Sequence, residues 1–334
     1  MIRLIPPLIG AALAAAIIIS IPARAEPIAV TAKPVALDSS DASRDRTGNL
    51  TYLGGLRLRS DAKGFGGFSG LDISADGAEM IAVSDFGRRL DARLTYAKDG
   101  RLAGISNARL APLTGLDGKP ITGKGEGDAE DIARLGDELL VSFERHHRIL
   151  AYGADVAIVR AVGPPPGLEK APANGGIEAL TALPGGRLLA ILEAATAVSG
   201  GASSGASPAW VRRGQSWSKM HYARTGKLSP SGAATLPGGK GEGDVLVIER
   251  HWSLLVGTRV RIAHLGANDL AKAGPGTMLR AREIARLEAP LIVDNFEGIA
   301  IRRGPGGAAY VYLISDDNFN PLQETLLLMF RLDG

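Results

Sequence analysis

Short apolar segments recur along the chain, and a glycine-rich turn separates each from the next. The clearest pair lies at 294–320, where Asp294-Asn-Phe-Glu-Gly-Ile-Ala-Ile leads through a turn at 302–307 into Tyr310-Val-Tyr-Leu-Ile-Ser. This pattern predicts two antiparallel strands around a tight turn. Glu297 lies near the start of the first strand, and Asp316 and Asp317 follow the second. A buried carboxylate is costly unless it is solvated, so we expect these acids to line a water-filled centre.

The same arrangement occurs five times: a small or acidic strand start, a glycine turn, an apolar strand and then an acid. The units begin at Phe68, Gly127, Gly176, Ser229 and Asp294. The acids after the apolar strands are Asp85, Glu144, Glu193, Glu249, Asp316 and Asp317. The units start at intervals of roughly fifty to seventy residues, which is the length of a propeller blade with its loops.

Each unit continues into further strand-like segments, and four short antiparallel strands repeated around an axis form a β-propeller. We therefore predict an all-β fold, a β-propeller with five or six blades, whose ring is closed by the segment 49–58 pairing into the last blade. A sixth unit has room at 102–125 or 265–293. A β-sandwich is the alternative, but it does not account for acids at the same two places in nearly every unit.

The N-terminus has the pattern of a secretory signal peptide. Arg3 precedes an apolar run at 8–21, and Ala23-Arg24-Ala25 forms a small-residue cleavage site. A membrane anchor is the alternative, but the apolar run is short for a span. We predict a signal peptide at 1–25, cleavage near Ala25, and a periplasmic or secreted protein with no membrane span after cleavage.

The mature chain divides into two parts. The segment 26–48 is rich in alanine, proline and aspartate without periodicity, which predicts a flexible N-terminus. The remainder, 49–334, is expected to form a single domain. A Gly/Ala/Ser segment at 195–207 precedes Trp210 and Trp217, and it is interpreted either as a linker or as a lid over one mouth of the channel.

Composition narrows the chemistry. The chain of 334 residues has no cysteine, which excludes disulfides and thiolate metal ligands. Its net charge is +3 without a marked run of lysine or arginine, so nucleic acid is not an expected partner. The 44 glycines and 19 prolines are spread along the chain, which fits many short strands joined by turns.

In a propeller the first strand of each blade lines the central channel. The predicted strand starts would bring together Asp72, Glu130 or Asp131, Glu178 and Glu297. Such a set of carboxylates raises one another's pKa unless cations compensate. Arg145 and Arg250 each follow an exit glutamate and are suited to pair with carboxylates or to hold an anionic ligand.

A hard divalent cation is the other means of compensation, because oxygen-rich clusters suit Ca²⁺ or Mg²⁺. The candidate metal ligands are Glu130, Asp131, Glu178 and Glu297. The alternative is structural: the acids cap turns and join neighbouring blades through salt bridges.

Known catalytic signatures are poorly represented. The segment 201–205 matches G-x-S-x-G, but no strand-turn-helix surrounds it. His146 and His251 follow the Glu-Arg pairs and are candidates for a general base, with surface packing as the alternative.

Several motifs together resemble a known family. The order DAEDIA, NGGIEAL, VIERHWS, DNFEGIAI and SDDNFNPLQETLLL is similar to that of the phytase-like family of exported bacterial proteins, over about 52–332. The motif positions are Asp85, Glu130, Asp131, Glu144, Arg145, Asn174, Glu178, Glu249, Arg250, Asn295, Glu297, Asp316, Asp317, Asn318 and Gln323. The resemblance implies a β-propeller and hydrolysis of phosphate or carboxylic esters with calcium. The fourth unit departs from the pattern, because Ser231 stands where other units have an acid.

Two functions follow. The first is an exported hydrolase of phosphate or carboxylic esters, with a small-molecule ester or anionic ligand as its partner and calcium as its cofactor. Its catalytic residues would be Glu178, Glu297 and Asp316, and its substrate-binding residues Arg145, Arg250, Asn174 and Asn318. The second is a non-catalytic periplasmic propeller that binds a small ligand or an envelope protein. The oligomeric state stays open.

Overall fold

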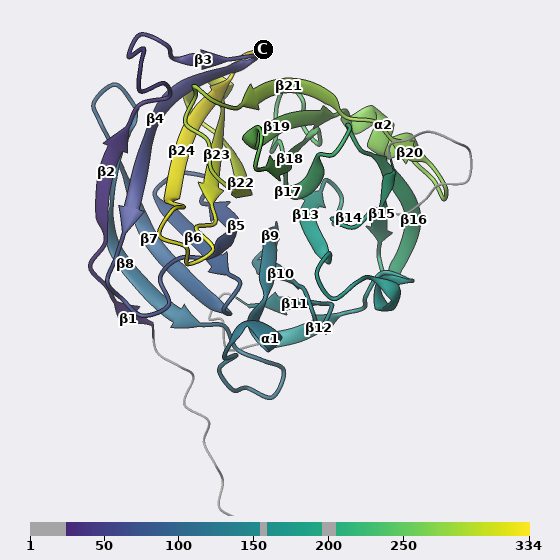
Figure 1. Ribbon diagram of the computed structural model, residues 1–334. Helices are drawn as coiled ribbons and strands as arrows, with labels where there is room; N and C mark the ends of the chain where they lie inside the picture. Colours follow the sequence, from purple (N-terminus) through teal and green to yellow (C-terminus); the bar gives the residue numbers. More distant parts are fainter. Residues whose placement is uncertain (1–24, 154–158, 196–204) are drawn as a thin grey trace, which may run out of the picture.

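The computed structural model describes residues 25–153, 159–195 and 205–334. Five sheets are arranged radially around a central axis, which confirms the predicted β-propeller and fixes the number of blades at five (Figure 1). Their strands pair antiparallel except for β20, which pairs parallel with β16. The predicted signal peptide, except for Ala25, lies outside the described residues, as does most of the segment 195–207. Within the described residues, no helix is long and apolar enough to cross a membrane.

The blades follow one another along the chain. Blade 1 contains β5 (Phe68–Ile73), β6 (Glu79–Ser84), β7 (Arg88–Tyr96), β8 (Leu102–Pro112) and β1 (Glu26–Pro27). Blade 2 contains β9 (Ala129–Leu135), β10 (Glu138–Phe143), β11 (Arg148–Tyr152) and β12 (Val159–Val162). Blade 3 contains β13 (Ile177–Leu183), β14 (Arg187–Leu192), β15 (Ala206–Arg213), β16 (Ser216–Ala223) and β20 (Met278–Leu279).

Blade 4 contains β17 (Ser229–Thr235), β18 (Val245–Ser253), β19 (Gly257–Leu265) and β21 (Arg282–Leu287). Blade 5 contains β22 (Phe296–Arg303), β23 (Ala309–Ser315), β24 (Thr325–Leu332), β4 (Leu50–Arg59) and β2 (Thr31–Val35). The short strand β3 (Arg46–Thr47) pairs with β4. In the part of the chain that the structure describes, the helical segments are brief: α1 (Lys124–Gly127), α2 (Ala267–Lys272) and two 3₁₀ turns, Leu168–Lys170 and Pro305–Gly307.

The ring is closed by a strand from early in the chain. β4 pairs antiparallel with β24, as predicted for 49–58. The prediction of a flexible segment at 26–48 is corrected, because this stretch forms β1, β2 and β3. β1 adds to β8 of blade 1 and β2 adds to β4 of blade 5. The edge strand of a sheet has backbone N–H and C=O groups without partners. Strands of the segment 26–48 pair with these groups on blades 1 and 5, which are neighbours in the ring.

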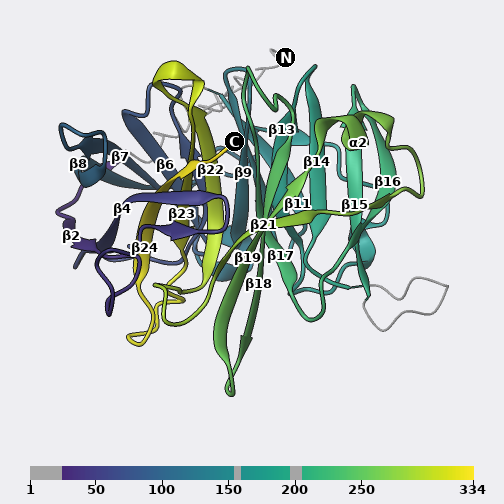
Figure 2. The same cartoon turned by 90° about the horizontal axis from the view of Figure 1, so that it is seen from above.

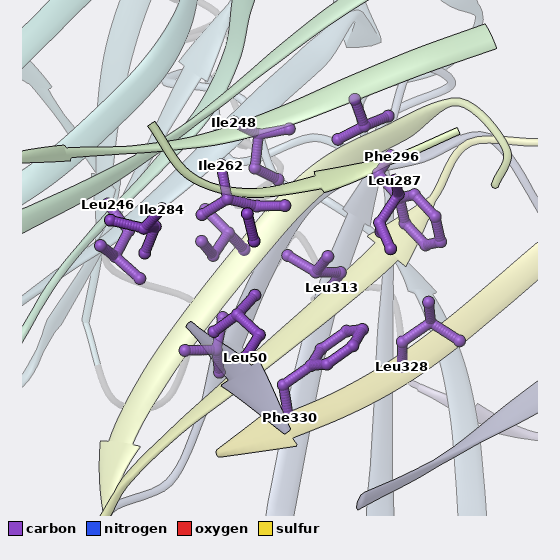
Figure 3. Close-up of a cluster of buried hydrophobic side chains, with 14 of the residues drawn as sticks. Leu50, Leu246, Ile248, Ile262, Ile284, Leu287, Phe296, Leu313, Leu328 and Phe330 are labelled. Carbon is purple, nitrogen blue, oxygen red and sulfur yellow. The ribbon is translucent and has the colours of Figure 1, made fainter. Parts of the chain in front are cut away.

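The core consists of apolar layers between adjacent blades. Figure 3 shows the layer between blades 4 and 5, where Ile248 and Ile262 face Leu313 and Phe330, with Leu50 from β4 beside them. All five side chains are fully buried. Burying one such side chain contributes about 1.5–3 kcal/mol, so the stacking of the blades supplies the stability that disulfides cannot provide here.

The two regions considered for a sixth blade have other structures. The stretch 102–125 forms β8 and the connection to α1, and 265–293 forms α2, β20 and β21. Trp210 and Trp217 lie within blade 3, and their indole N–H groups donate to the carbonyl oxygens of Pro166 and Gly163. These two rings therefore pack against the connection between blades 2 and 3, which is incompatible with a lid formed by them.

Candidate functional site

The innermost strand of every blade has a β-bulge at the same place. In each case one extra residue of the inner strand lies opposite the second strand, and the residues at this level are Ser69, Glu130, Glu178, Ser231 and Glu297. All five are buried. A bulge re-aims a side chain relative to a regular strand. The repeated bulge therefore forms a ring of three glutamates and two serines around the axis.

The residue that follows the bulged residue along the inner strand is small in four of the five blades. The residues at this level are Gly70, Asp131, Ala179, Gly232 and Gly298. A Cβ atom added to Gly232 would lie 2.1 Å from the carbonyl oxygen of Glu297, so only glycine allows these inner strands to approach so closely.

Asp131 lies across the channel at this level. Its Oδ2 accepts hydrogen bonds from the backbone N–H groups of Leu180 at 2.8 Å and Ala233 at 3.1 Å, and its Oδ1 accepts one from Ile132 at 2.8 Å. A single carboxylate thus joins the inner strands of blades 2, 3 and 4. These contacts engage both oxygens of Asp131 in holding the blades together.

A second ring lies one residue beyond each second strand. In four blades the backbone N–H at this position donates to the strand entry, and the residues are Asp85, Glu144, Glu193 and Asp316. The register of blade 4 places Arg250 at the equivalent position. The interpretation of Glu249 as the exit acid is corrected: Glu249 is fully buried away from the axis, where it accepts hydrogen bonds from Tyr222 and Arg261.

Arg250 is the cation at the centre of these two rings. Its Nη2 lies 2.7 Å from Oε1 of Glu297, and the same oxygen accepts a hydrogen bond from Asn295 at 2.9 Å. The carboxylates of Glu297, Glu178, Glu193 and Asp316 raise the pKa of Arg250 despite its burial. Its Nε has no hydrogen-bond partner, so this guanidinium retains a donor for a ligand.

Three carboxylates of blade 2 lie close enough to share a cation. Asp128, Glu130 and Glu144 each offer an oxygen, and these oxygens lie within 4.8 Å of one another. All three side chains are buried, and Oδ1 of Asp128 has no hydrogen-bond partner. Glu144 accepts hydrogen bonds from the backbone N–H groups of Gly175 and Gly176. An all-oxygen set of this kind suits a hard cation such as Ca²⁺.

Two further cations border this group. Nζ of Lys124 donates to Asp85 at 2.6 Å and lies 3.4 Å from Asp128 Oδ1. Nε of Arg145 donates to Asp128 Oδ2 at 2.6 Å. Among the described residues, the carboxyl groups at this mouth outnumber the cations that contact them, so the site would have an excess of negative charge if all of them were ionised.

Burial controls the protonation of these acids. It raises the pKa of Asp85 to about 6, outweighing the ion pair with Lys124. Burial, followed by neighbouring carboxylates, raises the pKa of Glu130 and of Glu178 well above the usual range, and Arg250 opposes the shift of Glu178. The pKa of Asp316 is raised by burial and by Glu297. The mouth therefore holds protons that a solvated set of acids would release.

The remaining predicted residues lie at the border of the site. Asn174 is exposed in the turn before Gly175. Asn318 is exposed, and its backbone N–H donates to Asp316 Oδ1 at 2.6 Å. His146 pairs with Glu126 at 2.6 Å, outside the two rings.

The opposite mouth has a different character. A cavity of about 550 Å³ is lined by apolar residues of the inner strands, including Leu71, Ile132 and Ile299. Asp72 lies here, paired with Arg134 at 2.5 Å, so the structure does not bring it together with the three glutamates. Asp131 and the small residues around it lie between the two mouths.

Sequence reasoning did not select Asp128 and Lys124. Asp128 is the first acid of DAEDIA, and its position directly before a strand was the available signal. Lys124 lies in a Gly-rich connection without periodicity, and its contact with Asp85 depends on how blade 1 meets blade 2. Nothing in the sequence indicates that contact.

The fold and this carboxylate-lined mouth define a five-bladed propeller with an acidic central site. The chain belongs to the phytase-like family: the family model described as esterase-like activity of phytase matches residues 63–319. This match confirms the resemblance found in the sequence. A comparison with curated proteins returns no match.

Several solved structures match most of the chain at low identity. The PQQ-bound aldose sugar dehydrogenase of Streptomyces coelicolor is 14% identical, with a TM-score of 0.41 over 86% of this chain and 99% of that one. A chain of the nidogen/laminin complex is 12% identical, with a TM-score of 0.41 over 80% and 88%. A luciferin-regenerating enzyme is 12% identical, with a TM-score of 0.39 over 90% and 96%. These likenesses carry no argument about the chemistry of the site.

Proposed function

We propose that this protein is an exported, calcium-dependent hydrolase of phosphate or carboxylic esters that acts at the acidic mouth. The observation that carries the proposal is the group of Asp128, Glu130 and Glu144, whose oxygens lie within 4.8 Å of one another. Membership of the phytase-like family supports the reaction class. The signal peptide predicted at 1–25 from the sequence would direct the protein to a periplasmic or secreted location.

Calcium fits these residues, because every ligand atom is a carboxylate oxygen. Oδ1 of Asp128 accepts no hydrogen bond, and its ion pair with Nζ of Lys124 is long, at 3.4 Å. Compared with the ligands expected from sequence, Glu130 is retained, and Asp128 and Glu144 replace Asp131, Glu178 and Glu297. When bound, such a cation polarises an ester oxygen and makes a bound water more acidic.

The chain's own groups supply binding and proton transfer. Arg250 has a buried Nε without a hydrogen-bond partner, and this N–H could donate to an ester oxygen or to an acidic leaving group that enters the site. Lys124 and Arg145 both contact Asp128 and would attract an anionic group to this part of the site. Glu178 holds a proton because of its burial and donates it to the leaving oxygen as a general acid. Glu297 and Asp316 hold Arg250 and the adjoining loop in place.

The experiment is to measure the calcium content of the purified protein and its turnover of p-nitrophenyl acetate and p-nitrophenyl phosphate, before and after chelation. Glu130→Gln is the test variant. Asp72→Asn is the matched control, because Asp72 lies at the opposite mouth. Stoichiometric calcium and turnover lost on chelation and in Glu130→Gln, but retained in Asp72→Asn, would support the proposal. Background turnover of both esters by the calcium-loaded protein would refute it.

A non-catalytic propeller that binds a small ligand is the second candidate. The cavity of about 550 Å³ at the opposite mouth favours it, because a cavity of this size, lined by apolar residues and a few charged ones such as Asp72 and Arg134, accommodates a small molecule. Ligand binding that survives chelation and Glu130→Gln but is lost when Ile132 is replaced by a larger side chain would support this function.

A further inference from the structure

Exposed apolar side chains gather on the face that carries the acidic mouth. Four of them form the tip of the β18–β19 hairpin: Trp252, Leu254, Leu255 and Val256 are 64%, 88%, 95% and 47% exposed. The hairpin leaves the propeller directly after Arg250, and it extends beyond the neighbouring loops (Figure 2). Contiguous apolar side chains at a projecting tip are costly to leave in water. They therefore indicate a surface that binds another molecule or a membrane.

The remaining large apolar side chains that are exposed lie on other loops of the same face. Phe86 directly follows Asp85, Phe319 and Leu322 lie in the loop after Asp316, and Leu116 lies in the connection that leads to α1. The rings of Phe86 and Phe319 contact each other across blades 1 and 5, with centroids 4.8 Å apart. Among the residues that the structure describes, every large apolar side chain that is exposed therefore lies on the acidic-mouth face.

The chemistry of the hairpin tip identifies its partner. No charged residue occurs from Trp252 to Thr258, and Arg259 at the neck pairs with Glu288 at 3.1 Å. Leucine and valine gain free energy on leaving water, and an indole with one polar N–H favours the membrane interface. A convex tip needs a matching hollow on a protein partner, whereas lipid adapts to its shape. We infer that this face docks on a lipid bilayer, with the hairpin tip entering the boundary between headgroups and acyl chains.

Docking in this orientation turns the acidic mouth toward the lipid surface. Resting on the proposed function, this names the substrate class as esters carried by lipids, which reach the carboxylates from the bilayer. The exposed lip formed by Phe86 and Phe319 beside Asp85 and Asp316 gives an apolar chain a path to the site.

The test uses phosphatidylcholine vesicles, co-sedimentation and tryptophan fluorescence of the purified protein. Trp252 is the exposed indole, because Trp210 is buried and Trp217 is hydrogen-bonded to Gly163. We expect vesicle binding with a blue shift of the emission. The double variant Leu254→Ser, Leu255→Ser should weaken partition about tenfold or more, since each leucine contributes more than 1 kcal/mol when buried. Trp252→Phe should still sediment with vesicles but lose the blue shift.

Several results would overturn the inference. They are no sedimentation of the wild-type protein, equal sedimentation of the double serine variant, or binding only to anionic vesicles without dependence on the leucines. Self-association abolished by the double variant, without vesicle binding, would identify a protein partner instead. The vesicle assay requires no turnover, and Glu130→Gln should bind like wild type. Failure of docking is therefore distinguishable from failure of the hydrolase proposal, which soluble p-nitrophenyl acetate tests.

Discussion

The guanidinium of Arg250 lies 2.7 Å from the carboxylate of Glu297, across the boundary between blades 4 and 5. Arg250 occupies the position at which the other blades have an acid, and Glu297 belongs to the ring of bulged residues. The departure of blade 4 from the repeat thus places one cation within reach of the glutamates of its neighbours. The irregular blade neutralises part of the charge that the regular blades create.

We predict a strong coupling between these two residues. Arg250→Met should lower the free energy of unfolding by about 3 kcal/mol, because it leaves Glu297 buried without its cation. Glu297→Gln in the Arg250→Met background should restore much of the loss. Denaturant unfolding of the four proteins of this double-mutant cycle gives the coupling energy, and additive effects would show that the pair is not an interacting unit.

The blade 2 carboxylates should determine calcium affinity. Asp128→Asn, Glu130→Gln and Glu144→Gln should each weaken calcium binding by about tenfold or more, since each removes a charged ligand from a hard-cation site. Asp131→Asn should leave affinity within about threefold, because both its oxygens already accept backbone hydrogen bonds. Isothermal titration calorimetry measures the calcium affinity of each variant. A loss of affinity in Asp131→Asn equal to that of the other three variants would show that Asp131 is a calcium ligand.

Stability without metal should fall as pH rises. Burial raises the pKa of Asp85 to about 6 and raises the pKa of Glu130, Glu178 and Asp316 further above the usual range. These groups bind protons more tightly in the folded state, so their contribution is complete below the unfolded pKa of about 4 and is lost as pH rises through the folded pKa. Asp85 alone accounts for about 3 kcal/mol.

Thermal unfolding of chelated protein should therefore occur at a lower temperature at pH 8 than at pH 5.5. Glu178→Gln should flatten this dependence, whereas Asp72→Asn should not. Added calcium should stabilise more at pH 8, where its ligands are deprotonated. A melting temperature that rises from pH 5.5 to pH 8 without metal would contradict the raised pKa values.

Asp131 should be important for folding. Asp131→Ala leaves the N–H groups of Leu180, Ala233 and Ile132 buried without an acceptor and should cost about 3 kcal/mol or more. Asp131→Asn keeps an acceptor oxygen and should cost less. Urea unfolding monitored by fluorescence separates the two, and equal stability of Asp131→Ala and wild type would exclude the bridging role.

The close approach of the inner strands predicts a strong effect at Gly232. Gly232→Ala introduces a Cβ 2.1 Å from the Glu297 carbonyl and should destabilise by about 2 kcal/mol or more. Gly274→Ala is the control, because a Cβ there meets nothing within 4 Å. A comparable loss of stability in both variants would show that the close contact with Glu297 is not its cause.

The architecture could be predicted from the sequence because its signal repeats. Alternation of acid, glycine turn and apolar strand predicted the blades, and the strand at 49–58 predicted ring closure. The unit acids Glu130, Glu178 and Glu297 were found because each lies near the start of the first predicted strand of its unit.

The register could not be predicted, because a bulge decides which of two adjacent residues faces the axis. Glu249 and Arg250 are neighbours, and Glu130 and Asp131 are neighbours, yet in each pair the two side chains have different surroundings. A shift of one residue in the register exchanges the residue that faces the axis with its neighbour. The composition of the chain does not show which register the strand adopts. The N-terminal strands β1 and β2 likewise depend on edges supplied by distant parts of the chain.

The pairing of β4 with β24 also determines the order of assembly. Its partners, such as Leu58 and Thr325, are separated by almost the entire domain, so this contact closes the longest loop in the molecule. During synthesis, β4 emerges early with its partners β2 and β3, but the edge that pairs with β24 has no partner until the last blade emerges. The intermediate is an open arc whose two ends each expose an incomplete sheet. Folding should therefore be slow at its final step, and a chaperone that binds exposed strand edges would act at that step.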